Sequence, residues 1–223
     1  MAKGTKVKTQ VGKLKYVFIK GDGRNGAMPG EEPRMQFVAS LSVPTDGPAH
    51  KAFQALVDEE WATYKKANNV KGLPGTNGMK PETKPSDDKT DIDPATEEVR
   101  KVETGNTLIT FKTNTKWPDG KPQAIKLYGN NGESKTADIT EAYARADWFI
   151  GEGSTGIIHG TAQGNNIGGS DKVTLYLSAV QLGKLVKGEG EGVDIDEDIE
   201  SEAIDMGDDY VAPIEESGEQ PDL

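Results

Sequence analysis

The chain has 223 residues, enough for one domain with appendages, and its 26 basic and 37 acidic residues give a formal net charge of -11. Leu, Ile, Val and Phe account for only 43 residues, a fraction typical of a chain that folds in one part and is disordered in another. The lack of cysteine excludes a disulfide scaffold, a thiolate metal site and cysteine catalysis, and two histidines leave little for a histidine metal site. No apolar run is long enough to cross a membrane, so we expect a soluble intracellular protein.

The charge is distributed very unevenly along the chain. Positions 188–223 hold 15 acidic residues and no Lys or Arg, whereas positions 1–187 hold 26 basic and 22 acidic residues. Dense like charge with few core-forming residues predicts a disordered acidic tail over 188–223, attached to a weakly basic folded domain over 1–187. Such a tail either serves solubility alone, or competes as a polyanion for a basic groove on its own domain and docks on basic partners.

The first half of the domain predicts two strands, one helix and a long loop. The segment 14–20 is apolar on both faces, whereas 34–43 alternates strictly between apolar and polar residues, as in a sheet with one wet face. A helix is predicted to begin at Pro48 and to end near Asn68, because apolar residues recur there at helical spacing. The segment 68–105 contains four prolines and no aromatic residue, so we expect a flexible insertion.

The second half of the domain predicts further short strands over 109–116, 124–128, 157–162 and 173–177, with a short helix near 141–148. Turn residues separate these strands. Short strands with one or two helices favour a small closed barrel or a sandwich, because closure removes exposed sheet edges. The oligonucleotide-binding (OB) fold, a five-stranded barrel, is one such structure, and we take this mainly β architecture as the prediction.

The polar positions of these strands combine cations with aromatic rings. Cations neutralise phosphates, and an exposed ring can stack on any base of an unpaired strand. The residues predicted to contact phosphates are Arg34, Lys15, Lys112, Lys116, Lys121 and Lys126. The residues predicted to stack on bases are Trp117, Tyr128, Tyr176 and Tyr16. The alternative is that these are ordinary exposed sheet residues, and that Trp117 only packs its hairpin turn.

Two further motifs are weak. The glycines at 151, 153 and 156 match a dinucleotide fingerprint by spacing, but strand residues follow where a helix is needed, so we predict a bend between strands. Asp194, Asp196 and Asp198 match the start of a calcium loop, but Ile199 and Asp205 stand at positions that require Gly and Glu. No set of residues suggests catalysis, and we predict a protein that is not an enzyme and needs neither cofactor nor metal.

The order of these features resembles phage single-stranded DNA-binding proteins with an OB fold. The similar features are a lysine-rich start, Pro33-Arg34 before a strand that ends in Val43-Pro44, an amphipathic helix, a variable loop, the strands 107–115 and 173–183, and an acidic tail. They span nearly the whole chain, although no single motif among them is specific. This chain ends in Asp222-Leu223, where the family's tails commonly end in an aromatic residue.

The resemblance implies sequence-independent coating of single-stranded DNA, cooperative or as a homodimer, during phage replication and recombination in the cytoplasm of an infected bacterium. It also implies a tail that occupies the DNA groove when DNA is absent and recruits replication proteins such as a polymerase or a helicase-primase, with Asp222 and Leu223 at the contact. The alternative is a structural β-sandwich protein that decorates a phage particle.

Overall fold

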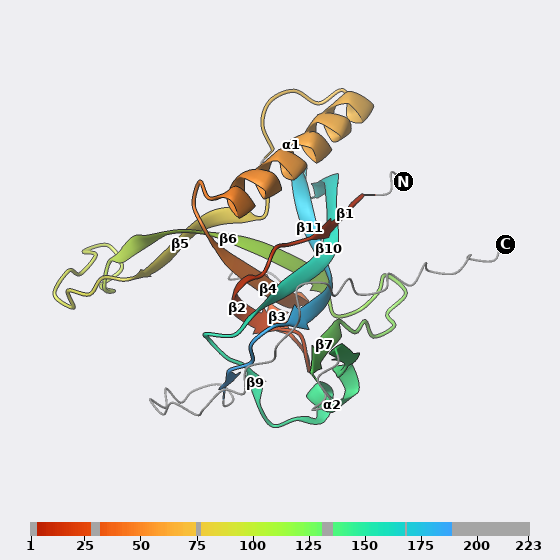
Figure 1. Ribbon diagram of the computed structural model, residues 1–223. Coiled ribbons are helices and arrows are strands. Elements are labelled where there is room, and N and C mark those ends of the chain that lie inside the picture. Colours follow the sequence, from red (N-terminus) through yellow and green to blue (C-terminus); the bar gives the residue numbers. More distant parts are fainter. Residues whose placement is uncertain (1–3, 28–31, 75–76, 131–135, 168, 189–223) are drawn as a thin grey trace.

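The computed structural model describes residues 4–27, 32–74, 77–130, 136–167 and 169–188 (Figure 1). The acidic tail predicted over 188–223 lies almost entirely outside these residues. The described chain forms two helices and twelve strands, with these bounds: β1 (Thr5–Lys8), β2 (Gly12–Phe18), β3 (Arg24–Asn25), β4 (Met35–Pro44), α1 (Pro48–Asn68), β5 (Met79–Pro85), β6 (Lys101–Asn114), β7 (Lys126–Asn130), β8 (Thr136–Asp138), α2 (Thr140–Arg145), β9 (Phe149–Ile150), β10 (Thr155–Ile167), β11 (Ser170–Leu182) and β12 (Lys187–Gly188).

Most of these strands belong to one curled sheet, in the order β5-β6-β4-β2-β10-β11-β7-β8. Strands β1 and β2 together occupy the position of one barrel strand, because β1 pairs with β10 while β2 pairs with β4. Strand β11 also lies beside β6, so the sheet curls until these two strands, which are not neighbours in the strand order, approach each other. Strands β1/β2, β4, β6, β10 and β11 thus make the predicted mainly β, OB-like barrel, and the fold class is confirmed.

The alternation seen in the sequence corresponds to the inner and outer faces of the barrel. Phe37 and Leu41 of β4 are buried, while Arg34 at the start of the same segment is exposed. Leu175 and Leu177 of β11 are likewise buried. Burying such side chains gives roughly 1.5–3 kcal/mol each, so the inward residues of these strands provide most of the stability of the barrel.

Helix α1 has the predicted bounds and lies across one end of the barrel, whereas α2 lies at the opposite end (Figure 1). Phe53 points from α1 into the barrel and meets the ring of Phe111 edge-on, with 5.9 Å between the ring centroids. Further along α1, the Tyr64 hydroxyl donates a hydrogen bond of 2.8 Å to Asp171 at the start of β11. The helix is therefore tied both to the core and to the turn between β10 and β11.

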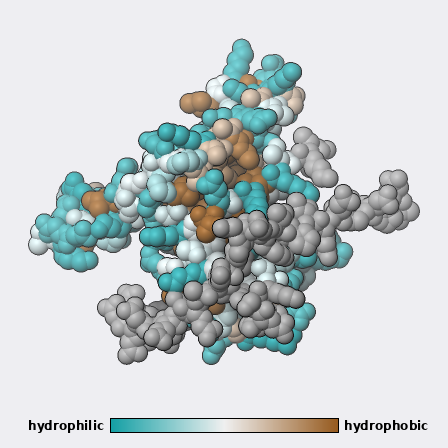
Figure 2. All heavy atoms as spheres, in the orientation of Figure 1, coloured by the Kyte–Doolittle hydropathy of each residue, from teal (hydrophilic) through white to brown (hydrophobic). Residues whose placement is uncertain are grey.

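The flexible loop expected over 68–105 is in large part a β-hairpin. Strand β5 pairs antiparallel with β6 down to Pro85 opposite Lys101, and the pair projects from the barrel as an arm (Figure 1). The prediction treated the prolines as evidence against strands, yet Pro81 and Pro85 lie in β5. Strand β5 is an edge strand, where a proline that lacks an N–H costs no ladder hydrogen bond on the open side. The outer end of the arm is covered mainly by hydrophilic residues (Figure 2).

Two smaller predictions are confirmed. The short helix expected near 141–148 is α2, and the glycine-rich segment 151–156 is the bend by which the chain passes from β9 into β10.

Within the described residues, neither helix combines the length and the apolar character that crossing a bilayer requires.

Candidate nucleic-acid interface

A groove of about 640 Å³ lies on the outer face of the sheet, where β6 and β11 lie beside each other. Strands β4, β6 and β11 supply most of its lining, and the start of β5 and the turn after β6 supply much of the rest. Five of its lining side chains are cationic: Arg34, Lys80, Lys112, Lys116 and Lys172. No Asp or Glu is among the described residues that line the groove, so the charge of this lining is positive.

The pairing of β4 with β6 fixes the floor of the groove. Gln36 stands opposite Asn114, and its Nε2 donates a hydrogen bond of 3.1 Å to Asn114 Oδ1. At the entrance to β4, the backbone N–H of Arg34 donates to Asn25 Oδ1 at 3.1 Å, and its guanidinium donates to the carbonyl of Gly26 at 3.2 Å. These contacts hold Arg34 at the groove without neutralising its charge, because both acceptors are uncharged.

Lys112 lies in the middle of this charge cluster. Burial lowers the pKa of Lys112, and the nearby charges of Arg34 and Lys172 lower it further. In the part of the chain that the structure describes, no ion pair involves any of the five groove cations. The cations therefore repel one another, and a bound polyanion would relieve that repulsion.

Trp117 supplies a large exposed ring beside these cations. The turn that carries it is closed by two backbone hydrogen bonds, from Trp117 N to the carbonyl of Lys121 and from Gly120 N to the carbonyl of Trp117, both 2.9 Å. The side chain is 53% exposed and lines the groove. A tryptophan ring left this exposed by a well-formed turn is available to stack on a flat ligand.

Tyr176 supplies a second ring, on β11. It is half-buried, and its hydroxyl accepts a hydrogen bond of 2.9 Å from Asn165 Nδ2 on β10. Asn165 is itself held by Thr174, whose hydroxyl donates to its Oδ1 at 3.1 Å. The ring is thus fixed in place before any ligand binds, so less side-chain entropy is lost on stacking.

The structure brings five of the predicted DNA-binding residues into this one groove: Arg34, Lys112, Lys116, Trp117 and Tyr176. Strand alternation points Lys112 of β6 and Tyr176 of β11 outward from the barrel, whereas Arg34 just before β4 and Lys116 and Trp117 in the turn after β6 reach the groove from the ends of strands. Contact with DNA by each of them stays a prediction.

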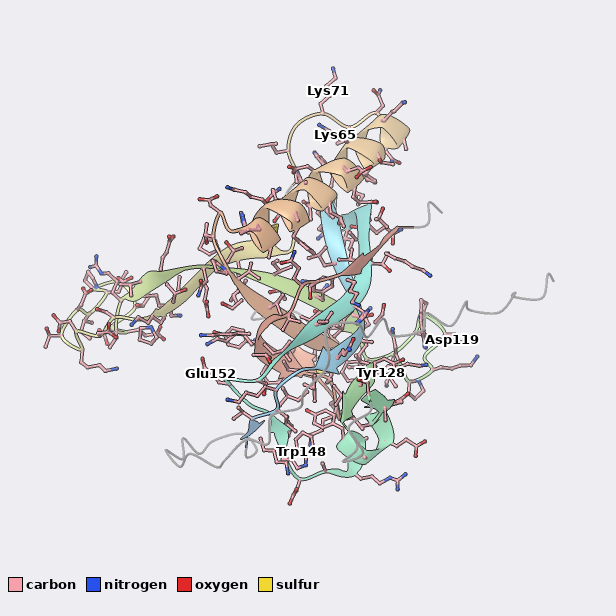
Figure 3. All side chains as sticks on the ribbon, in the orientation of Figure 1. Lys65, Lys71, Asp119, Tyr128, Trp148 and Glu152 are labelled. Carbon is pink, nitrogen blue, oxygen red and sulfur yellow. The ribbon has the colours of Figure 1, made fainter. Side chains whose placement is uncertain are left out.

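The other predicted residues lie elsewhere. Lys15 and Tyr16 line a different cavity, beside β2. Lys121, Lys126 and Tyr128 line neither cavity, and Lys121 forms an ion pair of 3.0 Å with Asp119. Tyr128 lies on β7, well apart from Glu152 at the other cavity (Figure 3). Asp222 and Leu223 are outside the described residues.

Two groove cations were missed by sequence reasoning. Lys172 shares the outward row of β11 with Thr174 and Tyr176. Extending the alternation by one step, from Thr174 to Lys172, would therefore have found it. Lys80 was hidden, because it falls in the segment expected to be an irregular loop.

The described residues offer no site for a metal ion, since no three of their His, Cys, Asp and Glu side chains lie close enough together to hold one. The chemistry that the groove does support is the binding of a polyanion with flat, stackable groups: it combines cations, exposed or half-buried rings and the amides of Gln36 and Asn114.

Comparison with known proteins identifies the fold. No family model matches the chain, and no curated protein matches it in sequence. Among solved structures, gp2.5, a single-stranded DNA-binding protein of bacteriophage T7, matches with a TM-score of 0.52 and 16% identity, over 85% of this chain and 92% of that one. This chain has the fold of the T7 protein. The resemblance expected from the sequence is thereby confirmed at the level of the fold.

A second solved structure is the single-stranded DNA-binding protein of bacteriophage Enc34 in complex with single-stranded DNA. It matches with a TM-score of 0.48 and 17% identity, over 83% of this chain and 88% of that one.

Proposed function

We propose that this protein binds single-stranded DNA without sequence preference, in the groove between β6 and β11. The observation that carries the proposal is a groove whose described lining has five cations, no acidic residue and two accessible rings, Trp117 and Tyr176. The cations would neutralise phosphates, and the rings would stack on bases. A duplex, whose bases are already stacked on one another, would gain only the first of these contributions. The fold shared with the T7 protein supports the proposal.

The test is a salt titration of binding to a thymidine oligomer and to a duplex of the same length. If about five phosphates are neutralised, the logarithm of the binding constant should fall with the logarithm of the salt concentration at a slope of about −3.5, and the single strand should bind more tightly. Equal affinity for both forms, or no binding at low salt, would overturn the proposal and favour the alternative of a structural phage protein. That alternative assigns no role to a cluster of unpaired cations.

The acidic tail extends this proposal. Positions 189–223 contain 15 acidic residues and no basic ones, and the structure places their point of attachment at Gly188. A polyanion tethered to the same domain as a cationic groove competes with DNA at a high local concentration. Truncation after Lys187 should therefore tighten DNA binding at low salt. A full-length chain with the same 15 residues changed to Asn or Gln separates charge from length, because it should behave like the truncated one. Unchanged affinity in both would contradict the competition.

The biological setting that we propose is phage DNA replication and recombination, in the cytoplasm of an infected bacterium and without catalysis by this chain. In this setting the end of the tail, with Asp222 and Leu223, recruits replication proteins such as a polymerase or a helicase-primase. Removing these two residues should abolish capture of such a partner while leaving the affinity for DNA unchanged. Homodimer formation belongs to the same proposal and can be tested by sedimentation with and without DNA.

A further inference from the structure

A second cavity, here called the recess, lies on the other side of β4 from the groove. Its volume is about 1050 Å³. It is lined by β2, by the base of the arm at 82–85, and by the segment 149–152 around β9. None of the proposals above uses this cavity, although it is the larger of the two and Tyr16 is exposed in it.

Tyr16 occupies an unusual backbone position. Its φ is 51°, a left-handed conformation that residues other than Gly, Asn and Asp seldom adopt. The pairing of β2 with β4 shifts register here, between Lys15 and Phe18. As a result of this bulge, Val17 points into the core while Tyr16 is left 50% exposed at the recess. Bulges often redirect one side chain near a binding site.

Cations and carboxylates balance in the recess, because its described lining holds Lys15, Lys20 and Lys84 together with Asp22, Glu82 and Glu152. Lys15 forms ion pairs with Glu82 and Glu152, both of which line the recess. Lys20 donates hydrogen bonds to the carbonyls of Ala146 and Trp148, at 2.9 and 2.6 Å, and lies over the ring of Phe149 at 4.0 Å. The recess therefore offers rings and apolar surface without a net positive charge in its described lining. It is suited to a base and not to a phosphate.

The recess and the groove lie on one continuous face of the sheet. In the outward row across β4, Val38 is paired on one side with Phe18, which lines the recess, and on the other with Lys112, which lines the groove. Opposite residues in antiparallel strands have Cα atoms about 4.5–5.5 Å apart, so Phe18 and Lys112 are separated by only about 10 Å. In the next row, Lys15–Ser40–Thr110, Ser40 is buried and its hydroxyl is hydrogen-bonded to that of Thr110 at 2.9 Å, so the crossing point is the row of Val38. This distance is short enough for one DNA strand to occupy both cavities.

We propose that the recess is a second base-binding subsite, which receives nucleotides of the strand held in the groove after it crosses β4. Tyr16 provides the stacking surface, and Phe18 lines the recess beside it. This inference rests on the proposed function, because the strand is anchored by the cations of the groove.

The test compares Tyr16→Ala with Tyr16→Phe on thymidine oligomers of increasing length. For the unchanged protein and for Tyr16→Phe, affinity should rise in two stages, first as the groove fills and again as the strand reaches the recess. Tyr16→Ala should lose the second stage, which amounts to between about fivefold and about a hundredfold for long oligomers, and should bind short ones normally. Leu73→Ala, which trims an 89% exposed apolar side chain elsewhere, is the matched control and should leave both stages intact.

Tyr16→Gly guards against a folding artefact. Glycine accepts the left-handed backbone without strain, so this variant should be at least as stable as Tyr16→Ala while also lacking the ring. It should lose the second stage in the same way. Equal loss for short and long oligomers, or normal binding of long ones by both variants, would overturn the subsite while leaving the groove intact. If the unchanged protein binds no oligomer of any length, the proposed function itself fails.

Discussion

The groove and the recess border the same outer face of the sheet, yet they hold their charges in opposite ways. In the groove, five cations line the surface, and no acidic residue is among the lining residues that the structure describes. In the recess, Lys15 is matched by Glu82 and Glu152, and Lys20 is held by backbone carbonyls. The larger cavity is thus the less cationic one. The position of unpaired charge, rather than cavity size, indicates where the phosphates of a nucleic acid would bind.

The pKa shifts express the same contrast. In the groove, burial and neighbouring cations lower the pKa of Lys112, which means that its charged form is disfavoured there. In the recess, burial alone would raise the pKa of Glu82, but hydrogen bonds from Ser42, Asn106 and Thr104, with the charge of Lys15, outweigh it and leave the pKa below its usual value. Neighbouring groups thus stabilise the charged form of Glu82 in the recess, whereas the surroundings of Lys112 in the groove destabilise its charged form.

The largest effect is expected from reversing a groove charge. Lys112→Glu removes a cation from the centre of the cluster and places a carboxylate where a phosphate should lie, so the affinity for single-stranded DNA should fall by about a hundredfold. Lys121→Glu makes the same change of charge outside the groove lining and is the control, for which a much smaller loss is expected in the same filter-binding assay. Equal losses would show that only net charge matters and would remove the distinction between groove and surface.

Removing the exposed ring of the groove comes next. Trp117→Ala should cost about 1–3 kcal/mol of binding free energy, because one base loses its stacking partner, while Trp117→Phe should keep most of the affinity. The intrinsic fluorescence of Trp117 in a Trp61, Trp148-substituted background should be quenched by a thymidine oligomer. An unchanged spectrum would place this ring outside the contact.

A change in the recess should affect folding more than binding. Glu82→Gln removes a carboxylate that accepts hydrogen bonds from three side chains, so we expect the free energy of unfolding to fall by about 1–2 kcal/mol in a urea titration at pH 7. The folded pKa of Glu82 is lowered, so its contribution is present above its unfolded pKa and is lost as the pH falls through the folded value. The difference between the two proteins should therefore shrink in acid.

The matched variant for this change is Glu152→Gln, whose side chain is 78% exposed and which should alter stability little. Both variants should bind short oligomers normally, since neither side chain lines the groove. A loss of short-oligomer binding in a folded Glu82→Gln protein would mean that the two cavities do not act separately.

The smallest effect is a gain. Lys112→Met relieves repulsion from Arg34 and Lys172, so the variant should be more stable by a few tenths of a kcal/mol although it binds DNA less tightly. Lys71 follows α1 on the chain (Figure 3) and does not line the groove, so Lys71→Met should leave both quantities unchanged. Thermal unfolding in the absence of DNA measures the difference. A loss of stability in Lys112→Met would show that the groove charges do not oppose one another.

Strict alternation made the barrel and most of the groove predictable from the sequence. A period of two places Arg34 and Gln36 on the wet face of β4, Lys112 on that of β6 and Tyr176 on that of β11, and the structure agrees. No knowledge of the partner strands was needed for this, because alternation depends only on which side of each strand is packed.

The rest depended on pairing, which the sequence does not display. Lys126 and Tyr128 have the right alternation, but β7 pairs with β11 at Ala179 to Gln181, beyond the part of β11 that lines the groove. The bulge at Tyr16 inserts a residue that interrupts the alternation, which is why 14–20 seemed apolar on both faces. Both differences concern where strands meet, a property set by tertiary contacts rather than by local pattern.

The bond between α1 and the β10–β11 turn has a consequence for how binding is controlled at a distance. Asp171 accepts hydrogen bonds from Tyr64 and from Asn166, each at 2.8 Å. The Tyr64 side chain can pack closely against β10 because Gly164 has no Cβ, which would collide with it. The turn carries Ile167 and Lys172 to the groove, which the helix itself does not line. Helix α1 therefore supports one wall of the groove, and anything that loosens its final turns, such as heat or a bound partner, should shift that wall and weaken the proposed DNA binding without contacting the groove.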